Sequence, residues 1–334
     1  MFVFAPPPPA PRSLVGATAR AARLAAVCAL TLALAACKSP PPPSPATASS
    51  SATGASPPPT GADAAHVARA DASPCVDVPC ETFARPEEAV AALLSKGPRV
   101  MAFGEAHAQK DGPGGPSTTK RFTDGLLPLF KGKATDLVLE LWVANGSCGK
   151  KTEQKVAQQQ KAVAAPQAAS NQNEFVTLGA AAKAAGIRPH VLTPPCEDYL
   201  RILDAGGGDV DQMLSMIARL TASDIGKFLD LTAGKDSLLI AYGGALHNDV
   251  VPKKGHESWS FGAELTRKLG AKYMEVDLVV PEAIRETDAW RSLAWHGKFV
   301  RERQGDRAVL MTVGPSSYVI FFPPRAASAD AGRD

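Results

Sequence analysis

The chain has 334 residues, with 36 Lys and Arg against 33 Asp and Glu, so its formal net charge is +3. That excess comes from Arg12, Arg20 and Arg23, because residues 1–36 contain no Lys and no acidic residue. The rest of the chain is therefore balanced in charge, which disfavours binding to the phosphate backbone of nucleic acids. The length allows one large domain or two small ones, at roughly 100–200 residues per domain.

Residues 1–36 predict an export signal. Their Arg residues precede an apolar run at 24–36, which is too short to cross a bilayer about 30 Å thick as a helix. The sequence Leu-Ala-Ala-Cys at 34–37 resembles the lipobox of bacterial lipoproteins, which implies that Cys37 carries a lipid anchor in the membrane. Lys38, where Asp would imply inner-membrane retention, then points to the outer membrane of a Gram-negative bacterium. The alternative is an ordinary signal cleaved nearby, with Cys37 an incidental thiol.

The composition divides the rest of the chain into three parts. Residues 37–81 begin with the lipid-carrying Cys and are rich in Pro, Ser and Ala. Such a segment buries too little apolar surface to fold and is typical of a disordered tether. Residues 82–325 are expected to form one α/β domain, and residues 326–334 a disordered tail.

Four cysteines remain once the two in the first 37 residues are set aside. An even number in an exported protein favours disulfides. Pairing Cys75 with Cys80 and Cys148 with Cys196 requires the least chain travel, because Cys148 and Cys196 each follow a predicted strand. A four-Cys zinc site is the alternative, but the paired Cys-x2-Cys spacing of such sites is missing.

The folded part alternates apolar runs with amphipathic helical patterns. Near-continuous apolar runs of this length suit strands that are covered on both faces. Strands alternating with helices predict a mostly parallel central sheet with helices on both faces. Two further runs around Gly314 predict a C-terminal antiparallel hairpin at the sheet edge. The predicted strands are 99–104, 135–142, 188–193, 236–242 and 272–280, the hairpin is 308–313 with 318–322, and the helical patterns are 122–130, 213–220 and 261–269. Residues 149–170 indicate a polar helix or a flexible insertion.

Acidic and imidazole groups follow three of these strands. Glu105 and His107 follow the first strand, Glu140 ends the second, and His247 follows the fourth after a Gly-Gly pair. Ligands of open α/β sheets bind beyond the carboxyl ends of the strands, so we expect these side chains to meet there. Two imidazoles and two carboxylates can bind a divalent ion such as Zn²⁺ or Mn²⁺. They can equally form a metal-free acid–base set in which Glu orients His.

These residues also carry a resemblance to a known superfamily. The Gly-x-x-His at 104–107, the Glu on the next strand and the Gly-x-x-His at 244–247 resemble the ChaN-like haem-binding-uptake, Tiki/TraB and erythromycin-esterase superfamily, over about residues 95–280. The resemblance implies a site built from His107, Glu140 and His247, and Glu105 matches the Gly-Glu-x-His form of the ChaN-like and esterase branches. Tiki-type members are similar to metal-dependent proteases, the esterase branch hydrolyses a macrolide lactone, and ChaN-like lipoproteins bind haem.

Three functions follow as hypotheses. The first is a metal-dependent hydrolase in which Glu105, His107 and His247 hold the ion, while Glu140 ligates it or acts as the base. The second is a haem-binding lipoprotein of an uptake system, which needs an axial donor. The third is a non-catalytic surface interaction protein whose polar site only stabilises the fold. The ligand would be a small molecule, haem or a peptide, and the candidate axial donors are His107, Tyr242, Tyr199 and His247.

Overall fold

The computed structural model describes residues 73–325, apart from residue 145 and residues 207–209. The predicted signal, Cys37, most of the tether and the C-terminal tail lie outside these residues. Within them, none of the helices combines the length and the apolar character needed to cross a membrane.

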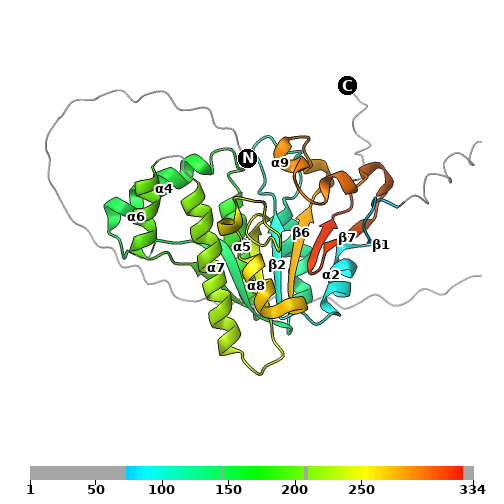
Figure 1. Cartoon of the computed structure of the whole chain (residues 1–334), viewed down its shortest axis with the longest axis horizontal. Coiled ribbons are helices and arrows are strands. Elements are labelled where there is room, and N and C mark those ends of the chain that lie inside the picture. The colour runs from blue at the N-terminus through cyan, green and yellow to red at the C-terminus, as the bar shows by residue number, and fades with distance from the viewer. Residues whose placement is uncertain (1–72, 145, 207–209, 326–334) are drawn as a thin grey trace, which may run out of the picture. The chain divides into compact units, whose positions relative to one another are not determined.

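A central eight-stranded sheet confirms the predicted α/β class (Figure 1). The strand order is β1-β7-β8-β6-β2-β5-β3-β4, and the pairs from β8 through β4 are parallel. The predicted C-terminal hairpin is β7 with β8, and β1 extends it as a further antiparallel strand. The strands are β1 (Cys80–Phe83), β2 (Val100–Glu105), β3 (Ala134–Trp142), β4 (Arg188–Leu192), β5 (Leu238–Gly244), β6 (Tyr273–Val279), β7 (Ala308–Gly314) and β8 (Ser317–Phe321).

Helices cover both faces of the sheet, which explains why its central strands are apolar throughout. On one face, α2, η1, η2 and α5 pack against Met101, Phe103 and Tyr242. On the other face, α7 and α8 pack against Val100, Val138 and their neighbours. The helices are α2 (Pro86–Leu94), α3 (Thr118–Arg121), α4 (Lys150–Val163), α5 (Asn171–Ala184), α6 (Cys196–Ala205), α7 (Asp211–Leu231), α8 (Gly262–Leu269) and α9 (Asp288–Arg291), with a π-helix η1 (Phe122–Leu126) and 3₁₀ turns η2 (Leu127–Phe130), η3 (Glu257–Trp259), η4 (Gly270–Lys272), η5 (Pro281–Ala283), η6 (His296–Lys298) and η7 (Arg301–Arg303).

The stripe predicted at 122–130 does not form one regular α-helix. The chain passes from α3 into the π-helix η1 and then into the 3₁₀ turn η2, where Pro128 lies in the first turn. Proline has no backbone N–H and clashes with the preceding turn of an α-helix, so the change of helix type at this position has a local cause.

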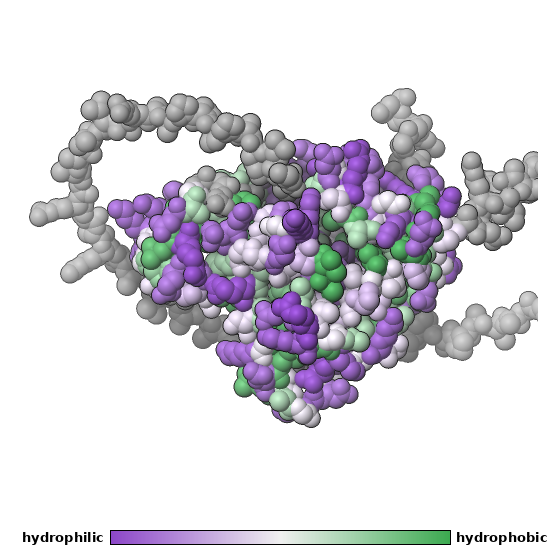
Figure 2. All heavy atoms as spheres, viewed as in Figure 1, coloured by the Kyte–Doolittle hydropathy of each residue, from purple (hydrophilic) through white to green (hydrophobic). Residues whose placement is uncertain are grey.

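A small helical layer beside the sheet has its own apolar core. Helices α4 and α6 and the first half of α7 bury Val156, Tyr199 and Met213, together with Ile202 and Met216. Disulfides link Cys148 to Cys196, at the start of α6, and Cys75 to Cys80, at the start of β1. The predicted pairing of the four cysteines therefore matches the structure. Over the face seen in Figure 2, hydrophilic residues surround smaller groups of hydrophobic ones.

Candidate functional site

The carboxyl ends of β2, β5 and β3 form one continuous edge, because these three strands are neighbours in the sheet. In register, Gly104 pairs with Gly243 and Glu105 with Gly244. Glu140 lies near the end of β3, and His107 and His247 follow β2 and β5 within three residues. The fold therefore brings together the four residues that the sequence placed at this edge.

Glu140 reaches the centre of the site because of a local irregularity and two glycines. The pairing of β3 with β4 shifts register between Leu139 and Trp142, and such bulges re-aim side chains. A Cβ atom on Gly243 would lie 2.5 Å from Glu140 Oε2, and one on Gly244 would lie 3.3 Å from it. The backbone N–H of Gly244 donates a hydrogen bond to Glu140 Oε2. The Gly-Gly pair therefore makes room for the carboxylate and binds it.

Glu105 fixes the orientation of the His107 ring through its Nδ1 atom. The Nδ1 atom of His107 lies 3.0 Å from Glu105 Oε1, while Glu105 Oε2 accepts hydrogen bonds from Thr119 at 2.9 Å and Tyr242 at 2.8 Å. With three donors on its two oxygens, Glu105 is an acceptor, so His107 donates through Nδ1. The Nε2 atom of the ring then faces Glu140, 3.7 Å from Oε1.

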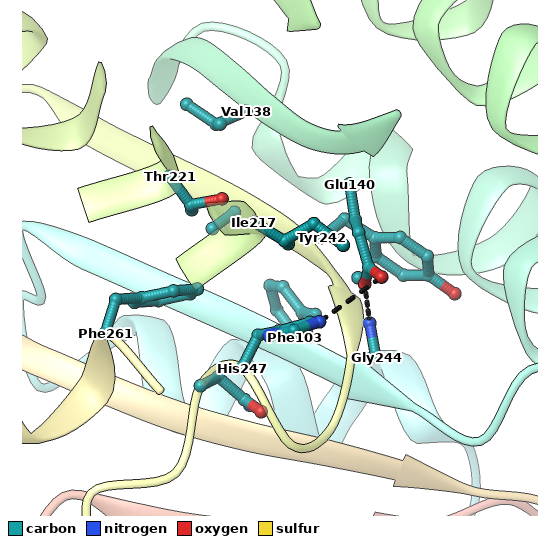
Figure 3. A pocket seen from close by; sticks show the side chains of 12 residues that line it. Phe103, Val138, Glu140, Ile217, Thr221, Tyr242, Gly244, His247 and Phe261 are labelled. Atoms are coloured by element: carbon teal, nitrogen blue, oxygen red, sulfur yellow. Dashed lines mark hydrogen bonds and ion pairs between the residues drawn. The ribbon is translucent and has the colours of Figure 1, made fainter. Parts of the chain in front are cut away.

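The His247 ring is also held at Nδ1 and directs Nε2 at Glu140, but a backbone carbonyl holds it instead of a carboxylate. Its Nδ1 lies 2.7 Å from the backbone carbonyl oxygen of Trp259, which can only accept a hydrogen bond, so Nδ1 carries a proton. Its Nε2 lies 3.3 Å from Glu140 Oε1 (Figure 3). Both imidazoles therefore direct Nε2 at the same carboxylate oxygen.

The charges at this point shift the pKa values of all three groups. Burial lowers the pKa of His107, but the hydrogen bonds to Glu105 and Glu140 and their negative charges outweigh it and raise the value to about 10. Burial likewise lowers the pKa of His247, while the charge and hydrogen bond of Glu140 and the Trp259 carbonyl raise it above its usual value. Burial raises the pKa of Glu140, but the two imidazoles hold it well below the ordinary range. The site thus favours protonated rings beside an ionised carboxylate.

Access to the site is from the side of His107. Its side chain is 22% exposed and that of Glu140 is 14% exposed, whereas His247 is 5% exposed. A pocket of about 10 Å³, enough for roughly one water molecule, lies beside Glu140 and His247 and is otherwise lined mainly by apolar side chains of β2, β3, β5 and α7 and by Phe261. His107 and Glu140 are therefore the more accessible groups of the site, while His247 is almost completely buried.

Several of the predicted metal and haem ligands are already engaged in other contacts or buried. Within residues 73–325, leaving out the four that are not described, no group of three or more His, Cys, Asp and Glu side chains is arranged to hold a metal ion. Both oxygens of Glu105, a predicted ligand, already accept hydrogen bonds. Tyr242 and Tyr199, two candidate haem donors, are 2% and 4% exposed. Metal and haem binding stay predictions.

His190 and Asp198 take part in ion pairs that do not involve Glu140. His190 pairs with Asp136 and stacks on Phe228. Asp198 pairs with Arg219 and Arg201.

Two of the groups that hold the imidazole rings were not predicted from the sequence. Thr119 and the Trp259 carbonyl come from loop and helix positions with no motif around them, and a backbone carbonyl has no sequence signal at all. Asn248, next to His247, is 2% exposed and joins a buried polar cluster. The sequence does contain one sign of this polar cluster: Glu275 and Asp277 interrupt the otherwise apolar strand β6 at alternate positions.

Comparisons with known proteins leave the family open. No model of a protein family matches the chain, and no curated protein matches it. Among solved structures, a chain described as "The structure of the type III effector HopBA1" matches with a TM-score of 0.38 and 11% sequence identity, covering 76% of this chain and 100% of that one. A likeness at this level carries no conclusion about function.

Proposed function

We propose that the protein is a hydrolase in which Glu140 and His107 move protons between water and a leaving group, while His247 stabilises the negative charge at the site. The observation that carries this proposal is the convergence of two imidazole Nε2 atoms on Glu140 Oε1, at 3.7 and 3.3 Å, while an acceptor fixes each Nδ1. A structural ion pair needs only one such ring. Two oriented rings on one partly exposed carboxylate are typical of general acid–base chemistry.

The proton transfers balance for the cleavage of an ester or amide. A water molecule next to Glu140 gives a proton to Oε1 as its oxygen bonds to the carbonyl carbon of the substrate. His107 gives its Nε2 proton to the leaving atom as the bond from carbon to that atom breaks. Glu140 then passes its new proton to Nε2 of the neutral His107, which restores both groups. This transfer is favourable because Glu105 and Glu140 raise the pKa of His107 to about 10, well above that of Glu140. His247 keeps its proton and stabilises the negative charge at the site.

Metal assistance is the alternative form of this proposal, because imidazoles and carboxylates are also ligands of Zn²⁺ and Mn²⁺. His107, His247 and Glu140 would be the residues that hold such an ion, which would lower the pKa of a bound water molecule. Haem binding and a purely structural site are the remaining alternatives, and both make different predictions for the same variants.

We also propose that the protein is exported and anchored to the outer membrane through a lipid on Cys37. The lipobox-like sequence before Cys37 and the two disulfides of the folded part support this location, since disulfides persist in oxidising compartments. Labelling cells with a radioactive fatty acid tests it: the wild-type protein should take up the label and a Cys37→Ser variant should not.

The experiment for the activity measures hydrolysis of a panel of nitrophenyl esters and anilides by the purified protein. His107→Gln and His247→Gln are compared with His190→Gln, the matched control, because His190 contacts a carboxylate but lies outside the site. We expect both site variants to lose hydrolysis while the control keeps it, and chelation with EDTA to have no effect.

The same preparation is analysed for bound metal and titrated with haemin. A stoichiometric metal that is lost in both site variants, together with inhibition by EDTA, would favour the metal-assisted form. A haemin complex that depends on His107 would replace the proposal with haem binding. Unchanged hydrolysis in both site variants, or loss of thermal stability as their only effect, would contradict it.

A further inference from the structure

Several hydrogen bonds hold the turn that carries His247. His247 N–H donates to the Gly244 carbonyl at 3.0 Å, and the His247 carbonyl accepts from Phe261 N–H at 2.9 Å. The carbonyl of Asn248 accepts a hydrogen bond from the buried hydroxyl of Tyr273, on β6, at 2.7 Å. These bonds fix the backbone of the turn. The side chain of Asn248 then connects it to two strands.

Asn248 is buried between β2 and β6. Its Nδ2 donates to the Ala102 carbonyl on β2 at 3.1 Å and to Asp277 Oδ1 on β6 at 3.2 Å. Its Oδ1 has no hydrogen-bond partner among the described residues. A buried amide oxygen without a donor is unfavourable, so a neighbouring donor is expected.

Asp277 is placed to supply that donor. A Cβ atom built on Gly104 would lie 2.6 Å from Asn248 Oδ1 and also 2.6 Å from Asp277 Oδ1, so the two oxygens flank the same bare backbone position. Glycine at 104 is therefore required for both side chains to reach this point. A carboxylate here would face the amide oxygen without a proton between them, whereas a carboxylic acid would donate to it.

The surroundings of Asp277 favour the acid. Burial raises the pKa of Asp277 well above its usual value, and the charges of Glu275 and Asp249 raise it further, while the hydrogen bond from Asn248 opposes the shift. Glu275, on the same strand, accepts hydrogen bonds from Val250 N–H and the Ser317 hydroxyl of β8. Asp249 lies in the turn itself and is also buried, with its pKa raised to about 7 by burial and by Glu275, against the effect of His247. No ion pair of a described Lys or Arg with any of these carboxyls is present in this cluster.

We infer that Asp277, as a neutral acid, and Asn248 form a buried acid–amide pair that fixes the turn carrying His247. Asp277 is thus a positioning residue that acts through Asn248 and holds His247 Nε2 at Glu140. The inference rests on the proposed function for its effect on catalysis, but the positioning itself is independent of any substrate.

Two substitutions of Asp277 separate hydrogen bonding from charge. Asp277→Asn keeps a neutral group that can donate to Asn248 Oδ1 and accept from its Nδ2. Asp277→Leu removes both hydrogen bonds at a similar size. Glu275→Gln is the matched control, because it changes the same buried cluster but contacts Val250 and Ser317 instead of Asn248.

The measurement is ¹⁵N NMR of the His247 ring in the full chain, with kcat and KM where hydrolysis is found. We expect the tautomer and pKa of His247 to be unchanged in Asp277→Asn and Glu275→Gln. In Asp277→Leu the pKa should fall toward 6.5, and kcat should drop about 10-fold with KM within 2-fold. Equal effects of Asn and Leu at this position, or an unchanged His247 in Asp277→Leu, would overturn the inference.

A second measurement uses the wild-type protein, so that poor folding of Asp277→Leu does not decide the outcome. The ¹³C signal of the Asp277 carboxyl should remain that of a neutral acid at pH 7, and a carboxylate signal there would overturn the inference. If His247 responds as expected but the wild-type protein hydrolyses nothing, the positioning role stands and the proposed hydrolase fails.

Discussion

The sheet contains two contacts between histidine and carboxylate side chains, and they differ in whether the carboxylate is already fully hydrogen-bonded. At the beginning of β3 and β4, Asp136 is completely buried and accepts two hydrogen bonds from Arg188, at 2.9 and 2.8 Å, and one from His190 at 2.7 Å. His190 also stacks on Phe228, with ring centroids 3.9 Å apart. The buried carboxylate is therefore fully engaged by Arg188 and His190 and joins two neighbouring strands.

At the other end of β3, Glu140 meets two imidazoles without an arginine. One oxygen binds a backbone N–H, and the other faces two Nε2 atoms at distances beyond a short hydrogen bond. His107 keeps a partly exposed side chain. A histidine beside a carboxylate is therefore no sign of a site by itself. The difference lies in the carboxylate: Glu140 is 14% exposed and faces two imidazoles, whereas Asp136 is 1% exposed and has both oxygens bound by Arg188.

The largest expected difference between the two clusters comes from matched changes of their carboxylates. Glu140→Gln should lower kcat/KM roughly 10²- to 10⁴-fold, because it removes the group that accepts the water proton. Asp136→Asn should leave kcat/KM within about 3-fold and reduce the free energy of unfolding by about 1–3 kcal/mol, through the weakened Arg188 and His190 bonds. Kinetics and denaturant unfolding of both variants check this. If Asp136→Asn lost most of its activity and Glu140→Gln kept it, the roles assigned to the two carboxylates would be wrong.

A change of intermediate size is expected when the orienting carboxylate is neutralised. The pKa of His107 is raised to about 10, so the ring is protonated below that pH and its role as an acid is lost as pH rises through it. For stability the sign is the same: the contribution is complete below about 6.5, the unfolded value, and is lost as pH approaches 10. Glu105→Gln removes a main cause of the raised pKa of His107. The loss of activity and the loss of stability at high pH should therefore both shift toward pH 6.5.

An NMR titration of the His107 ring and a pH–rate profile measure this shift directly. In the structural cluster, the equivalent titration of His190 should be the same in wild type and Glu105→Gln. If the high-pH limb of the rate stays in place in Glu105→Gln, then His107 is not the acid that this limb reports.

The smallest effect is expected from the hydroxyl groups behind Glu105. Tyr242→Phe removes one of two hydroxyl donors to Glu105 Oε2, and Thr119 remains. Losing one buried hydrogen bond should cost about 1 kcal/mol of unfolding free energy. It should also raise the pKa of His107 slightly, because Glu105 becomes a stronger acceptor for the His107 N–H. Tyr273→Phe, which removes another buried hydroxyl, is the control: it should cost similar stability without changing the titration of His107. Equal titration curves in both variants would mean that Tyr242 does not act on His107.

The fold was largely readable from apolar runs, and the failures have local reasons. All predicted strands are present within two residues at most of their ends, because a strand covered on both faces must be apolar throughout. The edge strand β1 was missed: it has four residues, and its two central side chains are exposed, so it carries no apolar run. Helix α5 was also missed, since its Ala, Gly and Asn residues form no clear amphipathic stripe.

The sequence by itself determined which chemistry collects at the carboxyl edge, because strand ends in a parallel sheet share one edge and Glu105, His107, Glu140 and His247 each stand at or just after such an end. Only the tertiary structure decided their relations: that β5 lies between β2 and β3, that Glu105 supports His107 from behind, and that both rings meet at Glu140. The physical reason is that strand order and most of the side-chain contacts at this edge join residues far apart in the chain, such as Tyr242 with Glu105 and His247 with Glu140, and such contacts leave no periodic pattern in the sequence.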